Sequence, residues 1–208
     1  MKKLLPVILG VLSVGTAAYG ISFDTGINGM TPPAGATFTA SGSLGTKTQA
    51  GFVVLGVVGG ASGNEIDLGE WLQINLSAPA HWTKLTLGLL FDGPEYGDKN
   101  EIAVALADGV STFKLTATGL NTATWTGPGS VTCLSQADEQ HAAVWQINNP
   151  FGNVDVTTVR LYPASSNPNG NESDFGLVAF STPEGGSSLA LLGGALAMMG
   201  AVGRKFRK

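Results

Sequence analysis

The chain has 208 residues, of which 43% are hydrophobic and 12% charged, and its formal net charge is −4. Between residues 21 and 182, 14 Asp or Glu stand against 5 Lys or Arg, so this part lacks the basic patch with which proteins bind nucleic acid. Cys133 is the only cysteine, which excludes an intramolecular disulfide and leaves stability to a packed core or a bound metal.

The first 20 residues have the layout of a secretory signal peptide. Lys2 and Lys3 precede an apolar run, and small residues follow it at positions 16–18 and 20. We expect cleavage after Gly20, with cleavage after Ala18 as the alternative. A retained membrane anchor is disfavoured because the apolar run is too short to cross a bilayer comfortably. The sequence therefore predicts export across the inner membrane.

Residues 21–181 have the pattern of one all-β domain. Apolar and polar residues alternate, with the period of a half-buried strand, at residues 72–76, 85–91, 102–106, 113–117 and 159–162. Gly, Pro, Asn and Asp separate these runs, and Asp108-Gly109 is the strongest hairpin signal. The pattern predicts roughly eight to ten strands in a single antiparallel β-sandwich of the jelly-roll type.

Two segments of this domain, residues 64–67 and 91–101, concentrate oxygen ligands. Hard divalent cations such as calcium bind carboxylate and carbonyl oxygens on loops that can bend, and glycines lie near both segments. The spacing is not that of an EF-hand, and a solvated acidic turn is the competing interpretation. The predicted calcium ligands are Glu65, Asp67, Asp98 and Glu101, with Asp92 and Asn100 in reserve.

Catalytic patterns are weak. Glu95 and Glu101 could supply the two carboxyl groups of a glycosidase, but the sequence does not fix their separation. His81, His141 and Cys133 lack the spacing of a zinc site. No Gly-x-Ser-x-Gly elbow is present for a serine hydrolase. We therefore predict no catalytic residues and expect a protein that is not an enzyme.

Aromatic side chains offer a binding function instead. Flat rings can stack on sugar rings, and two of them lie in or beside turns, where exposure is expected. The predicted carbohydrate-binding residues are Tyr96 and Trp125. Packing in the core or at its rim is the competing interpretation for both.

Residues 182–208 form a separate C-terminal segment. Thr182-Pro183-Glu184-Gly185-Gly186 is followed by 17 uncharged residues, 187–203, and then by a cluster of Arg and Lys. Seventeen residues are the lower limit for a helix that spans a bilayer, and the cationic cluster marks its cytoplasmic side. We expect a C-terminal hydrophobic helix over residues 187–203, with the β domain outside.

The order of these parts resembles the PEP-CTERM proteins of Gram-negative bacteria, which exosortase sorts. In that family an intramembrane cysteine protease is thought to recognise a short proline-acidic motif, remove the tail and release or transfer the body. The resemblance implies a sorting motif at Pro183, Glu184, Gly185 and Gly186, although the second proline of Pro-Glu-Pro is missing here. Residues 64–101 also resemble a recurrent core of PEP-CTERM β-sandwich proteins, which implies a shared fold.

These features favour a non-enzymatic exported protein of the cell surface or extracellular matrix, with a sandwich stabilised by calcium. Its expected partners are a sorting protease of the exosortase type, extracellular polysaccharide, and the membrane through the C-terminal helix before processing. The alternative is a carbohydrate-binding module acting on exopolysaccharide, and a glycoside hydrolase is third. The fold alone does not choose among them, because sandwiches host all three.

Overall fold

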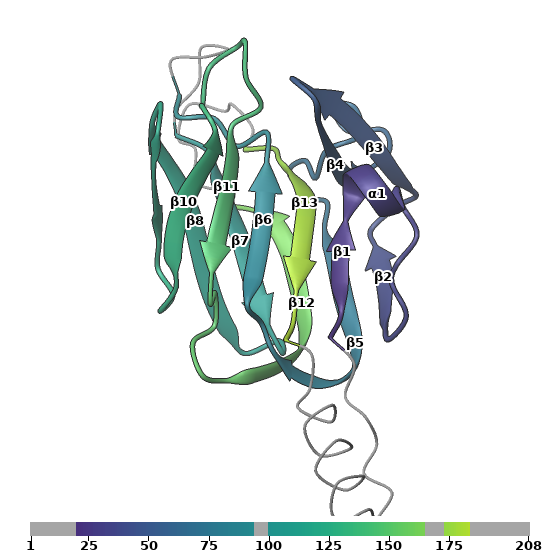
Figure 1. Cartoon of the computed structure of the whole chain (residues 1–208). Coiled ribbons are helices and arrows are strands. Elements are labelled where there is room, and N and C mark those ends of the chain that lie inside the picture. The colour runs from purple at the N-terminus through teal and green to yellow at the C-terminus, as the bar shows by residue number, and fades with distance from the viewer. Residues whose placement is uncertain (1–19, 94–99, 165–172, 184–208) are drawn as a thin grey trace, which may run out of the picture. The chain divides into compact units, whose positions relative to one another are not determined.

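The computed structural model describes residues 20–93, 100–164 and 173–183, which build two antiparallel β-sheets (Figure 1). The first sheet has seven strands in the order β10-β11-β6-β13-β4-β3, and β1 also pairs with β13. Their bounds are β1 Ser22–Asp24, β3 Leu44–Gln49, β4 Phe52–Val57, β6 Lys84–Gly88, β10 Ser130–Ser135, β11 Val144–Asn148 and β13 Gly176–Ser181.

The second sheet has six strands in the order β2-β5-β12-β7-β8-β9. Their bounds are β2 Ala36–Ala40, β5 Leu72–His81, β7 Ile102–Ala107, β8 Ser111–Gly119, β9 Thr122–Trp125 and β12 Asp155–Pro163. The predicted all-β fold is thereby confirmed in its coarse form. The described residues hold thirteen strands rather than eight to ten, because several short strands lack a clear alternation in the sequence.

The alternating runs became strands because one face of each is buried against the other sheet. In β5, for example, Leu72 and Ile74 are fully buried while Gln73 between them is partly exposed. One run ends earlier than its pattern indicates. Leu89 is buried but has a positive φ of 63°, so β6 ends at Gly88 and the chain turns away from the sheet.

Aromatic side chains join the two sheets in the core. Phe23 in β1 lies edge-on to Phe38 in β2, with their ring centroids 4.9 Å apart. Trp82 is fully buried, and its indole N–H donates to the carbonyl oxygen of Val156 at 3.1 Å. These contacts bury large apolar rings and satisfy the one polar group that they carry, which is the usual condition for a buried tryptophan.

The predicted hairpin at Asp108-Gly109 is confirmed. It joins β7 to β8, and both residues have positive φ angles, 48° and 71°. This is the left-handed geometry that a tight hairpin requires and that Asp and Gly tolerate. A single helical turn, α1 (Thr25–Asn28), follows β1, and the Asp24 side chain caps it by accepting from Gly26 N at 2.8 Å.

Residues 20–183 form one compact unit whose two ends are hydrogen-bonded to each other. Ile21 N donates to Thr182 Oγ1 at 3.0 Å, and Thr182 N donates to Ile21 O at 2.8 Å. The signal peptide, apart from Gly20, and the tail from Glu184 onward, including the expected helix over residues 187–203, lie outside the described residues. Within the described part of the chain, no helix is long and apolar enough to cross a bilayer.

Candidate functional site

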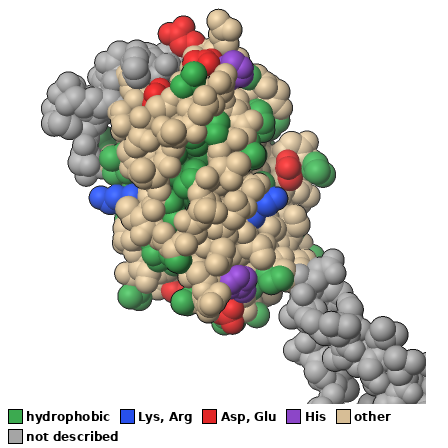
Figure 2. Space-filling model, turned by 60° about the vertical axis from the view of Figure 1, so that its left-hand side comes forward, with side chains coloured by type: hydrophobic (Ala, Val, Ile, Leu, Met, Phe, Trp, Pro, Cys, Tyr) green, Lys and Arg blue, Asp and Glu red, His purple; other side chains and the backbone are tan. Residues whose placement is uncertain are grey.

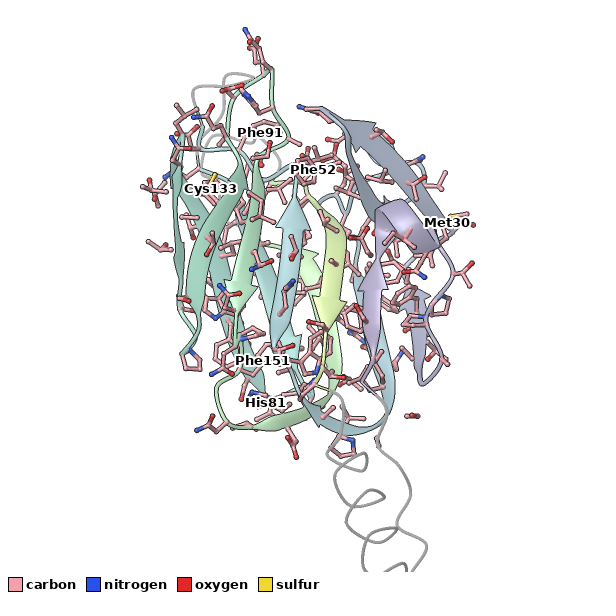
Figure 3. The ribbon with its side chains drawn as sticks, viewed as in Figure 1. Met30, Phe52, His81, Phe91, Cys133 and Phe151 are labelled. Atoms are coloured by element: carbon pink, nitrogen blue, oxygen red, sulfur yellow. The ribbon has the colours of Figure 1, made fainter. Side chains whose placement is uncertain are left out.

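A cavity of about 310 Å³ lies beside Phe91, at the end of the sandwich opposite His81 and Phe151 (Figure 3). We call it the acidic pocket. Phe91 and Gln49 contribute to its wall, and its ionisable or hydroxyl-bearing residues are Lys47, Ser62, Glu65, Glu101 and Asp174. Lys47 lies in β3, Ser62 and Glu65 in the loop between β4 and β5, and Glu101 and Asp174 just before β7 and β13. Residues far apart in the sequence therefore meet at this end.

The backbone around Glu65 is held tightly in place. Val57 N donates to Glu65 O at 2.9 Å, and Ile66 N donates to Phe175 O at 2.7 Å. A Cβ at Gly56 would lie 2.6 Å from the Glu65 Cα, so only glycine allows the strand to approach this loop. The carboxyl group is therefore positioned from both sides, by β4 and by the segment that leads into β13.

The Glu65 carboxyl group is buried, with its side chain only 2% exposed. Its Oε1 pairs with the Lys47 ammonium, which also donates to Ser62 O at 3.2 Å. Its Oε2 has no hydrogen-bond donor among the described residues. A buried carboxylate oxygen without a donor is costly, and such sites usually hold a proton or a cation.

Asp174 supplies a second carboxyl group beside Glu65. Its Oδ2 accepts from the Ser62 hydroxyl. Burial raises the pKa of Glu65 to about 9, and the hydrogen bond and negative charge of Asp174 add to this effect, while Lys47 partly opposes it. Two carboxyl groups can share a hydrogen bond only when one of them is protonated, and they repel each other when both are ionised.

Glu101 completes the acidic pocket from the other sheet and is itself buried. Its side chain accepts from Phe91 N, and its own N–H donates to Phe91 O at 3.1 Å. Glu101 therefore closes the base of the loop between β6 and β7. Three residues singled out from the sequence belong to that loop but lie outside the described residues: the predicted calcium ligand Asp98, the predicted sugar contact Tyr96 and the glycosidase candidate Glu95.

Asp67 does not line the acidic pocket. Its Oδ2 accepts from Ser62 N at 3.1 Å, and a Cβ at Gly60 would lie 1.5 Å from the same oxygen. Asp67 therefore stabilises the turn that carries Ser62. Of the reserve ligands, Asp92 is half-buried with an Oδ1 that lacks a donor among the described residues, and Asn100 is exposed.

The sequence prediction missed Lys47, Ser62 and Asp174 as parts of this site. No three His, Cys, Asp or Glu side chains of the described residues are grouped closely enough to enclose a metal by themselves. A cation at Glu65 and Asp174 would therefore complete its coordination with hydroxyl, carbonyl or water oxygens, which calcium accepts.

The remaining candidate residues lie elsewhere. Trp125 is half-buried, its ring stacks on Phe113 with centroids 5.7 Å apart, and its Nε1 donates to Pro150 O at 3.0 Å. His81 and Cys133 lie at opposite ends of the sandwich (Figure 3). His141 pairs with Asp138 at 2.6 Å. The arrangement thus separates His81 from Cys133 and gives His141 a carboxylate partner instead.

Comparison with known protein families, curated proteins and solved structures gives no match. The acidic pocket and the surface of the two sheets therefore carry the functional argument.

Proposed function

We propose that this is a non-enzymatic exported protein of the cell surface or extracellular matrix, whose β-sandwich is stabilised by calcium in the acidic pocket. The observation that carries the calcium proposal is the buried Glu65 carboxyl group, with Oε2 lacking a donor among the described residues and Asp174 beside it. Full ionisation of both carboxyl groups places like charges close together in a poorly solvated site. A divalent cation would offset that repulsion.

The chemistry of the acidic pocket supports the same proposal. Among the described residues, the carboxyl groups of Glu65, Glu101 and Asp174 line the pocket together with the ammonium group of Lys47. The ligand set fits a hard cation, because it consists of carboxylate oxygens with a hydroxyl and a carbonyl oxygen of Ser62 nearby.

The two ends of the chain support the export part of the proposal. The signal-peptide pattern of residues 1–20 and the resemblance of residues 182–208 to a PEP-CTERM tail indicate sorting by a protease of the exosortase type, with membrane anchoring through the tail at least until processing. Pro183, the first residue of the sorting motif, is exposed where the folded body ends.

A jelly-roll topology of the β-sandwich remains part of this proposal. Carbohydrate binding at Tyr96 and Trp125 also remains a prediction.

Calcium binding is tested by thermal unfolding of the full chain in calcium and in chelator. At about ten times the dissociation constant, calcium should raise the midpoint by about 3–6 °C, because it binds only the folded state. Glu65→Gln should abolish the shift. The matched control is Glu139→Gln, which makes the same change at an exposed position and should keep it. Equal midpoints in chelator and in millimolar calcium would refute the proposed site.

A further inference from the structure

A trough of about 650 Å³ lies on the surface of the second sheet and shares no lining residue with the acidic pocket. Its size is within the range of about 300–1,000 Å³ that is typical of small-molecule sites. We call it the aromatic trough. The residues that define it are Leu68, Trp71, Leu106, Arg160, Tyr162 and Pro163. They come from the residues before β5 and from β7 and β12, so the trough is supported by paired strands.

Trp71 differs from the other tryptophans of the protein. Trp82 and Trp145 are fully buried in the core, and Trp125 packs against it, whereas Trp71 has no part in the core cluster. Trp71 comes directly before β5, and Tyr162 lies in the neighbouring strand β12, next to the paired residues Leu72 and Leu161. Both side chains are half-buried and both line the trough, so covering them would remove apolar surface from water.

Arg160 is held in a defined position over the Trp71 ring. Its guanidinium carbon lies 4.5 Å from the centroid of the Trp71 ring, and its Nε donates to Gln73 Oε1 at 2.9 Å. These contacts fix a side chain that would otherwise lose considerable entropy on binding. A positioned guanidinium can donate paired hydrogen bonds to two neighbouring oxygens of a ligand.

Neutral polar side chains continue this surface beyond the trough. Gln73 Nε2 donates to Asn75 Oδ1 at 2.5 Å, and Asn75 Nδ2 donates to Thr39 Oγ1 at 3.3 Å. Among the described residues, Glu70 supplies the one carboxylate that lines the trough, and it accepts from Asp67 N at 3.0 Å. On the face of the body shown in Figure 2, the visible acidic side chains lie mostly near its upper and lower ends, and few charged side chains lie between them. The chemistry suits a ligand with hydroxyl groups and no net charge.

We propose that the aromatic trough binds a neutral pyranose polysaccharide. The apolar C–H face of a sugar ring would lie against Tyr162, and its hydroxyl groups would accept from Arg160. A polyanion is disfavoured because the body carries 14 acidic against 5 basic residues. This site is distinct from the predicted contacts Tyr96 and Trp125, and it goes beyond the proposed function because it requires no calcium.

The test is affinity electrophoresis of the full chain through gels that contain a neutral polysaccharide, namely hydroxyethylcellulose, glucomannan or dextran. A gel that contains alginate tests binding to a polyanion. The chain is kept in a detergent without a sugar head group, so that the detergent does not compete for the site. We expect retardation in at least one neutral gel and a loss of affinity of at least tenfold in Tyr162→Ala and in Arg160→Gln. Tyr162→Phe, which keeps the ring, and Lys114→Ala, which changes an exposed cation of strand β8, should both be retarded like the wild type.

Thermal unfolding of each variant separates a binding defect from a folding defect. Where Tyr162→Ala fails to fold, Arg160→Gln decides, because Arg160 is half-exposed and outside the core. The proposal is overturned if no neutral gel retards the wild-type protein, or if only the alginate gel does. It is also overturned if Trp125→Ala loses retardation while Arg160→Gln keeps it. None of these results would bear on calcium binding, which the melting experiment reads separately.

Discussion

Glu65 couples the stability of the fold to pH. Burial first, and Asp174 second, raise the pKa of this carboxyl group to about 9 from its ordinary value of 4.5. Between these two values the folded chain holds a proton that the unfolded chain has released. The free energy of unfolding must therefore fall as the pH rises through this range, by the linkage between proton binding and folding.

In chelator, we expect the free energy of unfolding to fall by about 1 kcal/mol per pH unit between pH 5.5 and 8 as a result of Glu65. Glu65→Gln mimics the protonated carboxyl group and should flatten this slope, whereas Glu139→Gln should keep it. Urea unfolding at several pH values measures all three slopes. Equal slopes in wild type and Glu65→Gln would show that Glu65 is ionised in the folded protein.

At the scale of single residues, the sequence predicted part of the acidic pocket. Glu65 and Glu101 were expected to share a site, and both line the same cavity. Asp174 was missed because it meets Glu65 only through the bridge between Ile66 and Phe175, a contact between distant parts of the chain. Local composition also did not distinguish Asp67, which stabilises a turn.

The hairpin between β7 and β8 has support from a third strand. The Asp108 Oδ1 atom accepts from Thr157 N at 2.9 Å and from Thr158 N at 2.8 Å, in β12. Asp108→Ala removes these bonds and places alanine at a φ of 48°. We expect a loss of about 1–2 kcal/mol in the free energy of unfolding.

Asp108→Asn is the control for this prediction, because asparagine keeps an acceptor oxygen and tolerates positive φ. It should change the free energy of unfolding by less than about 0.5 kcal/mol. Denaturant unfolding of both variants measures the difference. Equal losses of unfolding free energy in the two variants would show that the carboxylate charge of Asp108, and not the turn geometry, is responsible.

Among the elements, predictability followed the regularity of the hydrophobic alternation. The runs that became β5, β8 and β12 alternate clearly, because one face of each packs on the core. Strand β7 is apolar on both faces, and its alanines at 103, 105 and 107 belong to the core, whereas Ile102 and Leu106 on the other face are half-buried. The region of β1 to β4 escaped prediction. Its strands are short or rich in Thr and Gly, and β4 is buried along most of its length, so its apolar residues do not alternate.

At the scale of the whole molecule, the last two strands complete both sheets. β12 lies between β5 and β7, and β13 lies between β6 and β4 while also pairing with the first strand, β1 (Figure 1). The second sheet is continuous only when the chain has been made as far as Pro163, and the first only when it has been made as far as Ser181. A chain that stops before β12 therefore lacks a central strand of each sheet.

The sequence patterns at the two ends of the chain predict processing at both of them. If the signal peptide and the tail are removed in the cell, the mature mass should correspond to a chain that starts at Ile21 or Tyr19 and ends near the sorting motif. Mass spectrometry of the protein from its native cells measures this. An intact C-terminus would make the tail a permanent anchor, and an unprocessed chain soluble in the cytosol would contradict export altogether.

Such trimming should leave the melting midpoint of the body nearly unchanged, because the hydrogen bonds between Ile21 and Thr182 remain. A further deletion through Asp24 should not be tolerated. It removes Phe23, whose ring is 1% exposed and stacks on Phe180 with centroids 5.6 Å apart. Loss of a buried Phe costs about 3–5 kcal/mol, which corresponds to roughly 10 °C in a domain of this size. The two truncations thus distinguish ends that can be removed from strand β1, which the fold requires.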